Sequence, residues 1–271
     1  MTAMIFPTSS NTQASPVRRT VQPIATARLV KVELRKMFNT RSGFWLLVSI
    51  GVLSVLATVA VIVFAPQDKV TYESFATAIG LPMSVILPMI AILAVTSEWS
   101  QRSGLTTFTL VPSRGRVVGA KAIATVLVGL GSTAIAFAVG AVGNLVGSTL
   151  AGVDTVWDVS LAAVPQMALG NLIGMAIGFT LGVVLRASAA AIVGYFVVAF
   201  VLSGVLELLA MVKPWFLDLQ PWIDWNFTQV ELFAGDTNTA KEWAMLGSTT
   251  MIWIVIPPAI GLLTLRRAEV K

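Results

Sequence analysis

Three polar side chains fall deep inside long apolar stretches, and they are the residues that could act on a solute within a membrane. They are Asn144, Asn171 and Glu207. A carboxylate at the centre of a bilayer costs about 2.5–3.5 kcal/mol on insertion scales, so such groups are candidates for a transport pathway. Hydrogen bonding between helices is the alternative role of the two asparagines. Glu207 stands near the end of its stretch, where water can reach it, and no run of acids forms a proton relay.

The composition excludes most catalytic chemistry. The chain has no Cys and no His, which rules out disulfides, thiolate or imidazole metal sites and His-based acid–base catalysis. It also lacks the phosphate loop GxxxxGK[ST], because the nearest approach, 115–121, has neither the glycine–lysine pair nor the Ser/Thr. We therefore expect no enzymatic activity, no metal and no cofactor in this chain.

The segment 97–121, SEWSQRSGLTTFTLVPSRGRVVGAK, is basic and rich in Ser and Thr, and it separates two apolar stretches. It carries Arg102, Arg114, Arg116 and Lys121, with Glu98 as its only acid. Such a segment cannot lie in lipid, and it is longer than a simple connection needs. The sequence predicts a docking loop to which a partner on the same side of the membrane binds.

The elements that hold these residues are predicted to be membrane-spanning helices. Apolar residues make up 56% of the chain and charged residues 11%, whereas soluble domains carry about 25% charged residues. A bilayer core of ~30 Å takes roughly 20 helical residues. Six stretches meet this length: 44–64, 75–96, 122–150, 161–185, 189–211 and 244–265. The prediction is an all-α polytopic membrane protein with one domain, 27–271, after a flexible tail, 1–26.

The charge distribution predicts the orientation. Fifteen Lys and Arg residues fall at the ends of the chain, in the segment 97–121 and at Arg186, and only Lys69, Lys213 and Lys241 fall on the other side. Because Lys and Arg in short flanks stay in the cytoplasm, both termini are predicted to be cytoplasmic in the cell membrane. The basic residues stand next to apolar spans, so anionic lipid is a more natural partner than nucleic acid.

Two features near the spans predict packing. In 27–41, Val30, Leu34, Met37 and Phe38 share one helical face while Arg28, Lys31 and Arg35 take another, which indicates an amphipathic helix in the headgroup region. Small residues recur every four positions in two spans, which favours close packing of helices inside the chain over a dimer seam. These are Gly170, Gly174, Gly178 and Gly182, and Ser132, Ala136, Gly140, Asn144 and Ser148.

Helix breakers and tryptophans add two local predictions. Pro82, Pro88 and the pair Pro257-Pro258 are expected to kink or open their helices. The segment 212–243 has four tryptophans, which favours short interfacial helices on the outer side. They are Trp215, Trp222, Trp225 and Trp243.

Taken together, these features resemble the permease subunit of type-2 ATP-binding-cassette exporters, and most closely the permeases of actinobacteria. The most specific part is local, and it runs through Ser97, Glu98, Trp99, Gly104, Thr106, Thr107, Pro112, Arg114, Arg116 and Lys121. Leu105 separates Gly104 from Thr106, whereas many relatives have Gly directly before Thr.

The resemblance implies that the segment forms a coupling helix seated in a groove of a separate ATPase subunit. Two permeases, identical or paralogous, and two ATPases would make the exporter, with ATP and Mg held by the ATPase. Phe108, Leu110 and Val111 would anchor in an apolar cleft, Arg102, Arg114 and Arg116 would pair with acids, and Pro112 would end the helix.

Two other functions remain open on the sequence. An ion-coupled secondary carrier would need buried ionisable groups near the midplane, and Glu207 is the nearest approach to one. A non-transporting scaffold or regulatory subunit would need no pathway at all. The sequence selects neither the cargo nor the choice between a homodimer and a heterodimer.

Overall fold

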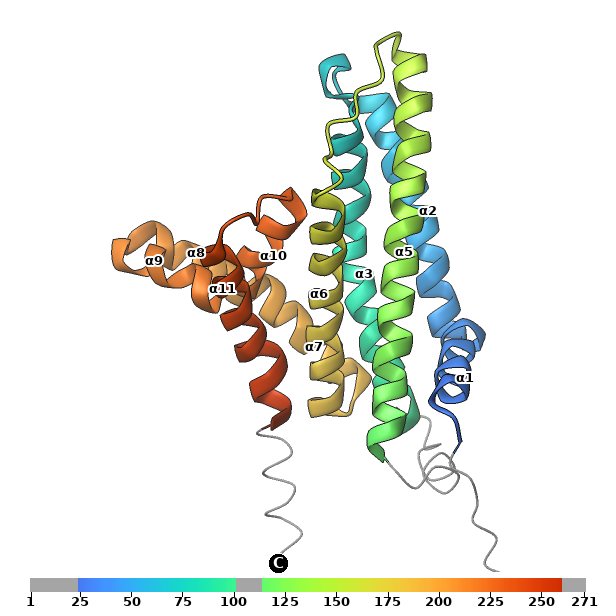
Figure 1. Cartoon of the computed structure of the whole chain (residues 1–271), viewed down its shortest axis with the longest axis vertical. Helices are drawn as coiled ribbons and strands as arrows, with labels where there is room; N and C mark the ends of the chain where they lie inside the picture. Colours follow the sequence, from blue (N-terminus) through green and yellow to red (C-terminus); the bar gives the residue numbers. More distant parts are fainter. Residues whose placement is uncertain (1–23, 101–113, 260–271) are drawn as a thin grey trace, which may run out of the picture.

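The computed structural model describes residues 24–100 and 114–259, and within these ranges every regular element is a helix (Figure 1). The elements are α1 (Thr26–Asn39), α2 (Arg41–Phe64), η1 (Gln67–Lys69), α3 (Tyr72–Ser100), α5 (Arg114–Ala151), α6 (Ala163–Leu185), α7 (Ser188–Phe196), η2 (Val197–Leu202), α8 (Ser203–Val212), α9 (Pro214–Ile223), α10 (Trp225–Ala234), α11 (Ala240–Thr250) and η3 (Met251–Val255).

Five helices of the described part are long and apolar enough to cross a membrane, by length and composition: α2, α3, α5, α6 and the continuous α7–η2–α8. They match the first five predicted spans to within a few residues at most ends, which confirms the all-α, multi-span prediction at this level. The exception is α5, which begins well before the predicted start of the third span. The sixth predicted span runs past residue 259, so part of it lies outside the described residues.

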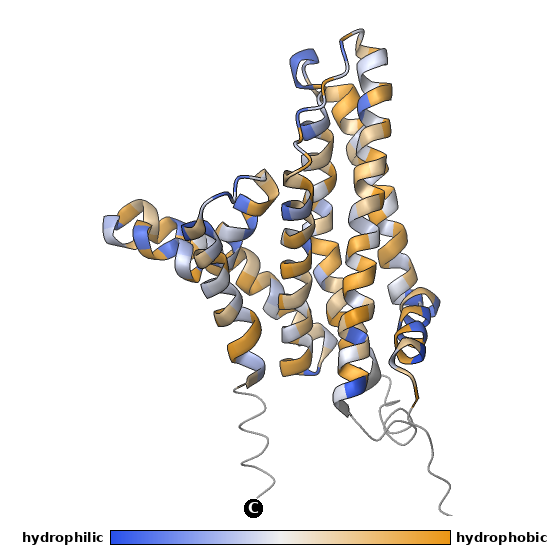
Figure 2. Ribbon diagram, in the orientation of Figure 1, coloured by the Kyte–Doolittle hydropathy of each residue, from blue (hydrophilic) through white to orange (hydrophobic). Residues whose placement is uncertain are grey.

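Helix α3 stands at the centre of the bundle and packs against α2, α5, α6 and α7 (Figure 1). Its buried face carries Ile79, Met83, Leu87 and Ile92, each at most 2% exposed. Hydrophobic residues run along nearly the whole length of these helices (Figure 2), and exposed ones such as Val59, Ile135 and Val193 show that the outward faces are apolar as well. Such all-round hydrophobicity is expected of helices that face lipid as well as one another.

The glycine stripe of α6 lies against α3 and α10, which confirms the prediction of packing within the chain. A Cβ at Gly178 would stand 2.6 Å from the carbonyl oxygen of Pro88, and one at Gly182 would stand 3.3 Å from that of Ile92. At Gly170 it would meet the ring of Phe233 at 2.9 Å. The missing side chains therefore allow two backbones to approach closely.

The small residues of α5 pack in the same manner. Gly140 faces Tyr72 and Ile79 on α3, Gly147 faces the ring of Phe75, and Asn144 and Ser148 are fully buried beside them. Helix α5 is 38 residues long, which at 1.5 Å per residue is about 57 Å and well beyond a ~30 Å bilayer core. At least one end of α5 must therefore stand outside the hydrocarbon layer.

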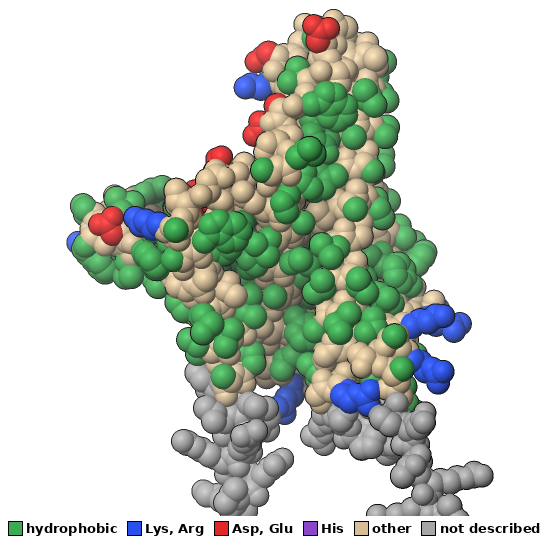
Figure 3. All heavy atoms as spheres, viewed as in Figure 1, with side chains coloured by type: hydrophobic (Ala, Val, Ile, Leu, Met, Phe, Trp, Pro, Cys, Tyr) green, Lys and Arg blue, Asp and Glu red, His purple; other side chains and the backbone are tan. Residues whose placement is uncertain are grey.

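Charges separate along the bundle (Figure 3). Four acids, Asp68, Glu73, Asp154 and Asp158, lie at the end that carries η1 and the connection between α5 and α6, which we call the acidic end (Figure 3). Most Lys and Arg side chains gather at the opposite end, beside α1, which we call the basic end (Figure 3). The described chain starts with α1 at the basic end, and α11 runs back toward that end (Figure 1).

The predicted outer segment 212–243 forms the short helices α9 and α10 and the start of α11, which lie to one side of the bundle (Figure 1). Two hydrogen bonds hold them: Gln229 donates to the Gly170 carbonyl at 2.7 Å in a buried bond, and the Trp253 indole donates to the Ile223 carbonyl at 2.8 Å in a partly buried one. Trp225 is buried in the core whereas Trp215 is 63% exposed. The tryptophans therefore do not all share one exposed belt, and the interfacial position of the segment stays a prediction.

Two π-helical stretches widen the last helices, at η2 and η3. Pro257 and Pro258 follow η3 after Ile256, and they cannot donate backbone hydrogen bonds to Trp253 and Ile254. The wider turn of η3 is the local opening of the helix that the sequence predicts at this proline pair. In η2, two side chains form hydrogen bonds with backbone carbonyl groups of the widened helix. Ser203 donates to the Val198 carbonyl and Asn226 donates to the Ala199 carbonyl.

The start of α11 has a pH-sensitive cap. The Thr239 hydroxyl accepts from the Glu242 backbone N–H, and the Glu242 carboxylate accepts from the backbone N–H groups of Thr239 and Asn238 at 2.8 and 2.7 Å. These backbone hydrogen bonds hold the pKa of Glu242 below its ordinary value of 4.5. The cap therefore contributes above pH 4.5 and is lost as the pH falls through the lowered pKa.

We expect the hydrogen-exchange protection of the Asn238 and Thr239 amides to fall as the pH is lowered below 4.5, once the rates are corrected for the intrinsic pH dependence of exchange. Glu242→Gln is expected to show no such step. Protection that is independent of pH in the wild-type chain would contradict this account of the cap.

Candidate functional site

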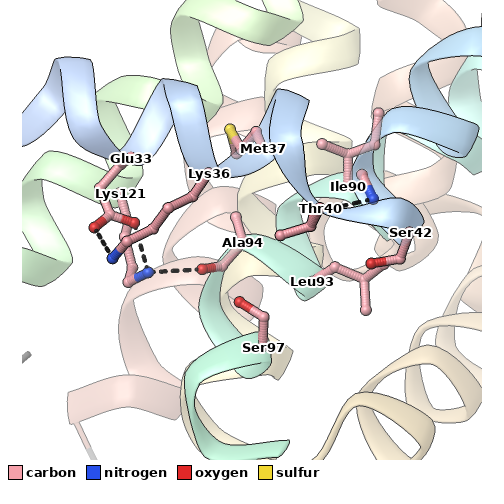
Figure 4. Close-up of a pocket in the computed structure, with 11 residues that line it drawn as sticks. Glu33, Lys36, Met37, Thr40, Ser42, Ile90, Leu93, Ala94, Ser97 and Lys121 are labelled. Atoms are coloured by element: carbon pink, nitrogen blue, oxygen red, sulfur yellow. Dashed lines mark hydrogen bonds and ion pairs between the residues drawn. The ribbon is translucent and has the colours of Figure 1, made fainter. Parts of the chain in front are cut away.

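The candidate site is the junction at the basic end where α1, the end of α3 and the start of α5 meet (Figure 4). The predicted docking segment joins the bundle here, since α3 ends at Ser100 and α5 begins at Arg114. The connection between these two helices is therefore 101–113, which is shorter than the predicted docking segment 97–121. Residues 114–121 belong to α5, because Val117 and Ala120 are buried on one helical face there.

A buried ion pair lies at the centre of the junction. The Lys121 ammonium is 2.7 Å from a carboxylate oxygen of Glu33, and it also donates to the Ala94 carbonyl at 3.0 Å. The other carboxylate oxygen of Glu33 is 2.7 Å from the ammonium of Lys36. The side chains of Lys121 and Glu33 are 5% and 10% exposed and that of Lys36 is 42% exposed. Figure 4 shows these groups converging from α1, α3 and α5.

The local sequence explains why Glu33 points inward. Val30, Glu33 and Met37 fall on one face of α1, at the spacing that brings side chains together on a helix, and all three are buried. Because Val30 and Met37 are buried on either side of Glu33, its carboxylate also lies in the junction, where Lys121 neutralises it. An acid on the apolar face of an amphipathic helix is the signal that could have revealed this pair, and the sequence analysis missed it.

The turn from α1 to α2 completes the junction. The Thr40 hydroxyl caps α2 by accepting from the Gly43 backbone N–H at 3.3 Å. A Cβ at Gly43 would collide with the Met37 carbonyl oxygen, so this close approach requires glycine. The turn sets the direction of α1 against the bundle, and it places Glu33 beside Lys121.

Only some of the predicted docking residues belong to the part of the chain that the structure describes. Lys121 faces α1 from inside the bundle, and the Arg116 guanidinium donates to the Ile24 carbonyl just before α1. Glu98 and Trp99 belong to the last turn of α3, and Arg114 is the first residue of α5. The other predicted coupling residues lie outside the described residues: Arg102, Gly104, Thr106, Thr107, Phe108, Leu110, Val111 and Pro112.

The three predicted pathway residues lie in different places. Asn144 is fully buried and donates to the Val156 carbonyl at 2.9 Å, near the acidic end. Asn171 is 7% exposed and donates to the Thr133 hydroxyl at 3.1 Å, between α6 and α5. Glu207 is exposed on α8. The structure therefore does not bring the three together; Asn171 lines a cavity among α3, α5, α6 and α10.

The junction ties three helices together. Both charges of the Glu33–Lys121 pair are compensated within the junction, and the Ala94 carbonyl takes a further hydrogen of the ammonium. Within the two described ranges, no group of Asp and Glu side chains is placed to hold a metal ion. What the arrangement can do is fix α1, α3 and α5 to one another.

Comparison with models of protein families and with curated proteins finds no match to this chain.

Proposed function

We propose that this chain is the membrane-spanning, non-catalytic subunit of an ATP-driven exporter of the type-2 ATP-binding-cassette class. It works as a dimer with a second permease and couples through 97–121 to a separate ATPase subunit, which holds ATP and Mg. The observation that carries the proposal is the buried Glu33–Lys121 pair beside the point where this segment joins the bundle.

The junction suits a mechanical input. A partner that moves the segment 101–113 pulls on the ends of α3 and α5 at once. Because Lys121 bonds both Glu33 on α1 and the Ala94 carbonyl on α3, the three helices follow the movement together. An arrangement of the helices that separated this pair would leave a buried charge without its partner, so the pair favours the observed geometry.

The same proposal assigns the orientation and the sixth span. The basic end faces the cytoplasm of a cell membrane, because Lys and Arg favour that side. Helix α11 and the residues after it then return across the bilayer, so both termini are cytoplasmic. This direction agrees with the course of α11 toward the basic end (Figure 1).

The test is co-purification with an ATPase. Replacing 106–116 by a Gly/Ser linker is expected to abolish the complex, which is measured as ATP hydrolysis that purifies with the tagged permease. Arg114→Gln/Arg116→Gln is expected to weaken the complex by at least about tenfold through the loss of two charge pairs. Arg186→Gln removes a charge from the turn between α6 and α7, and it serves as the matched control.

Assembly at the wild-type level after replacement of 106–116 would refute the coupling role. Transport by the chain alone in proteoliposomes that contain no ATPase would instead favour a secondary carrier.

A further inference from the structure

An apolar groove of about 490 Å³ runs along α5 between α1 and α2. It starts at Leu34 and Phe38 on α1, at the basic end, and follows α5 from Leu127 to Val139. The twelve steps from 127 to 139, at 1.5 Å each, span about 18 Å, which is close to half of a ~30 Å bilayer core. The groove therefore has the length that a lipid acyl chain occupies in one leaflet.

The groove is uncharged and opens on the surface of the bundle. Its only polar lining residues are Ser54 and Ser132. Phe38 and Ile135 also line it, and they are 52% and 64% exposed. At Gly131, on the α5 wall, a Cβ would meet nothing within 4 Å. In a membrane, lipid chains are expected to fill such a hollow, because an empty space forfeits the dispersion contacts of its lining.

Two cations stand on α1 beside the start of the groove. Lys31 precedes Leu34 by three residues, and Arg35 precedes Phe38 by three. Residues at this spacing are neighbours on a helix surface, with roughly 5–6 Å between their Cβ atoms. Both cations are exposed, and neither forms an ion pair within 24–100 and 114–259. Their charges are therefore available to a ligand.

The helices that wall the groove offer these cations no competing acid. Glu33 is the only acidic residue of α1, α2 and α5. Its carboxylate already lies 2.7 Å from the ammonium groups of both Lys121 and Lys36. The groove thus has a positive start and an uncharged length. This combination complements a lipid with a negative headgroup, since guanidinium and ammonium groups pair with phosphate.

We propose that this groove holds one anionic glycerophospholipid, with an acyl chain along α5 and the phosphate at Lys31 and Arg35. The hydrocarbon of the bilayer is as apolar as the groove, so the acyl chain alone gains little by entering it. The preference for this lipid over a zwitterionic one therefore comes from the two cations. The proposal depends neither on the ATPase nor on the exported cargo.

Native mass spectrometry of the full chain tests the proposal. The chain is released from micelles that contain equal amounts of phosphatidylglycerol and phosphatidylcholine with the same acyl chains. We expect one retained lipid per chain, and about tenfold more phosphatidylglycerol than phosphatidylcholine, because the choline cation cancels the charge of the phosphate.

Two charge variants test the position of the headgroup. Lys31→Gln/Arg35→Gln is expected to retain the two lipids equally. Lys213→Gln/Lys241→Gln is the matched control, because it also removes two positive charges and both residues lie outside α1, α2 and α5. It is expected to keep the preference for phosphatidylglycerol.

Two glycine variants test the position of the acyl chain. Gly131→Leu places a side chain in the groove without meeting a neighbouring atom at its Cβ, and it is expected to lower the retained phosphatidylglycerol about tenfold. Gly204→Leu adds the same side chain on α8, where a Cβ also meets nothing within 4 Å. It should retain phosphatidylglycerol like the wild type.

Equal retention of the two lipids by the wild-type chain would overturn the proposal, and so would a preference that survives Lys31→Gln/Arg35→Gln. Undiminished retention by Gly131→Leu would place the lipid on the surface of α1 instead of in the groove. A lipid-free dimer that Gly131→Leu dissociates would assign the groove to a second copy of the chain, which also overturns the proposal.

The ATPase is absent from these measurements. Failure here therefore leaves the exporter assignment intact, and failure of the co-purification leaves the lipid site intact.

Discussion

Glu33→Met is expected to lower the free energy of unfolding by about 3 kcal/mol, because it takes the carboxylate away from a buried ammonium. The Lys121 side chain is only 5% exposed, so water can replace little of the lost interaction. Lys121→Met is expected to cost less, since Lys36 still neutralises the Glu33 carboxylate at 2.7 Å. The double variant should be more stable than Glu33→Met, because an apolar pair of similar volume often replaces a buried ion pair at little cost.

Unfolding in mixed micelles of increasing SDS content measures all three variants, and the double-mutant cycle isolates the pair. Lys36→Met is the control, because its side chain is 42% exposed and an exposed pair contributes about 0–1 kcal/mol. If the effects of the single substitutions simply add in the double variant, the two charges do not interact, and the junction loses its role as a tie between α1, α3 and α5.

The spans could be predicted because each is a long apolar run that ends at charged or turn-forming residues. The fifth span was predicted at 189–211, and the helix occupies Ser188–Val212. The extension of α5 down to Arg114 could not be predicted in this way. Its first two turns carry three basic residues and two glycines, and they pack against α1, with Val117 buried and Lys121 paired with Glu33.

The residues of the junction were harder to predict than the bundle. Lys121 was predicted to help bind a partner, since it ends a basic segment, but its ammonium points into the protein because Glu33 lies opposite. Pairing across 88 positions of sequence depends on tertiary packing, which hydropathy does not encode. In the same way, Asn144 and Asn171 look equivalent in sequence, and the structure shows that Asn171 lines a cavity among α3, α5, α6 and α10 whereas Asn144 donates to the Val156 carbonyl.

Gly178→Ala is expected to destabilise the protein by about 1–3 kcal/mol, although alanine is the better helix former. A Cβ at this position would stand 2.6 Å from the Pro88 carbonyl oxygen and 3.2 Å from the Pro88 Cα, both of which are backbone atoms that cannot rotate away. Helices α3 and α6 would have to separate along the stripe. Gly182→Ala is expected to cost less, because its nearest contact is 3.3 Å.

Gly51→Ala in α2 is the matched control, since a Cβ there meets nothing within 4 Å. It is expected to be neutral or to stabilise by up to about 1 kcal/mol through helix propensity. All three variants add one methyl group to an apolar membrane helix, so hydropathy predicts the same small effect for each. Unfolding in SDS measures the three variants. If Gly178→Ala destabilises most, Gly182→Ala less and Gly51→Ala least, close backbone contact stabilises the bundle. Equal effects of the three substitutions would show that the stripe is dispensable.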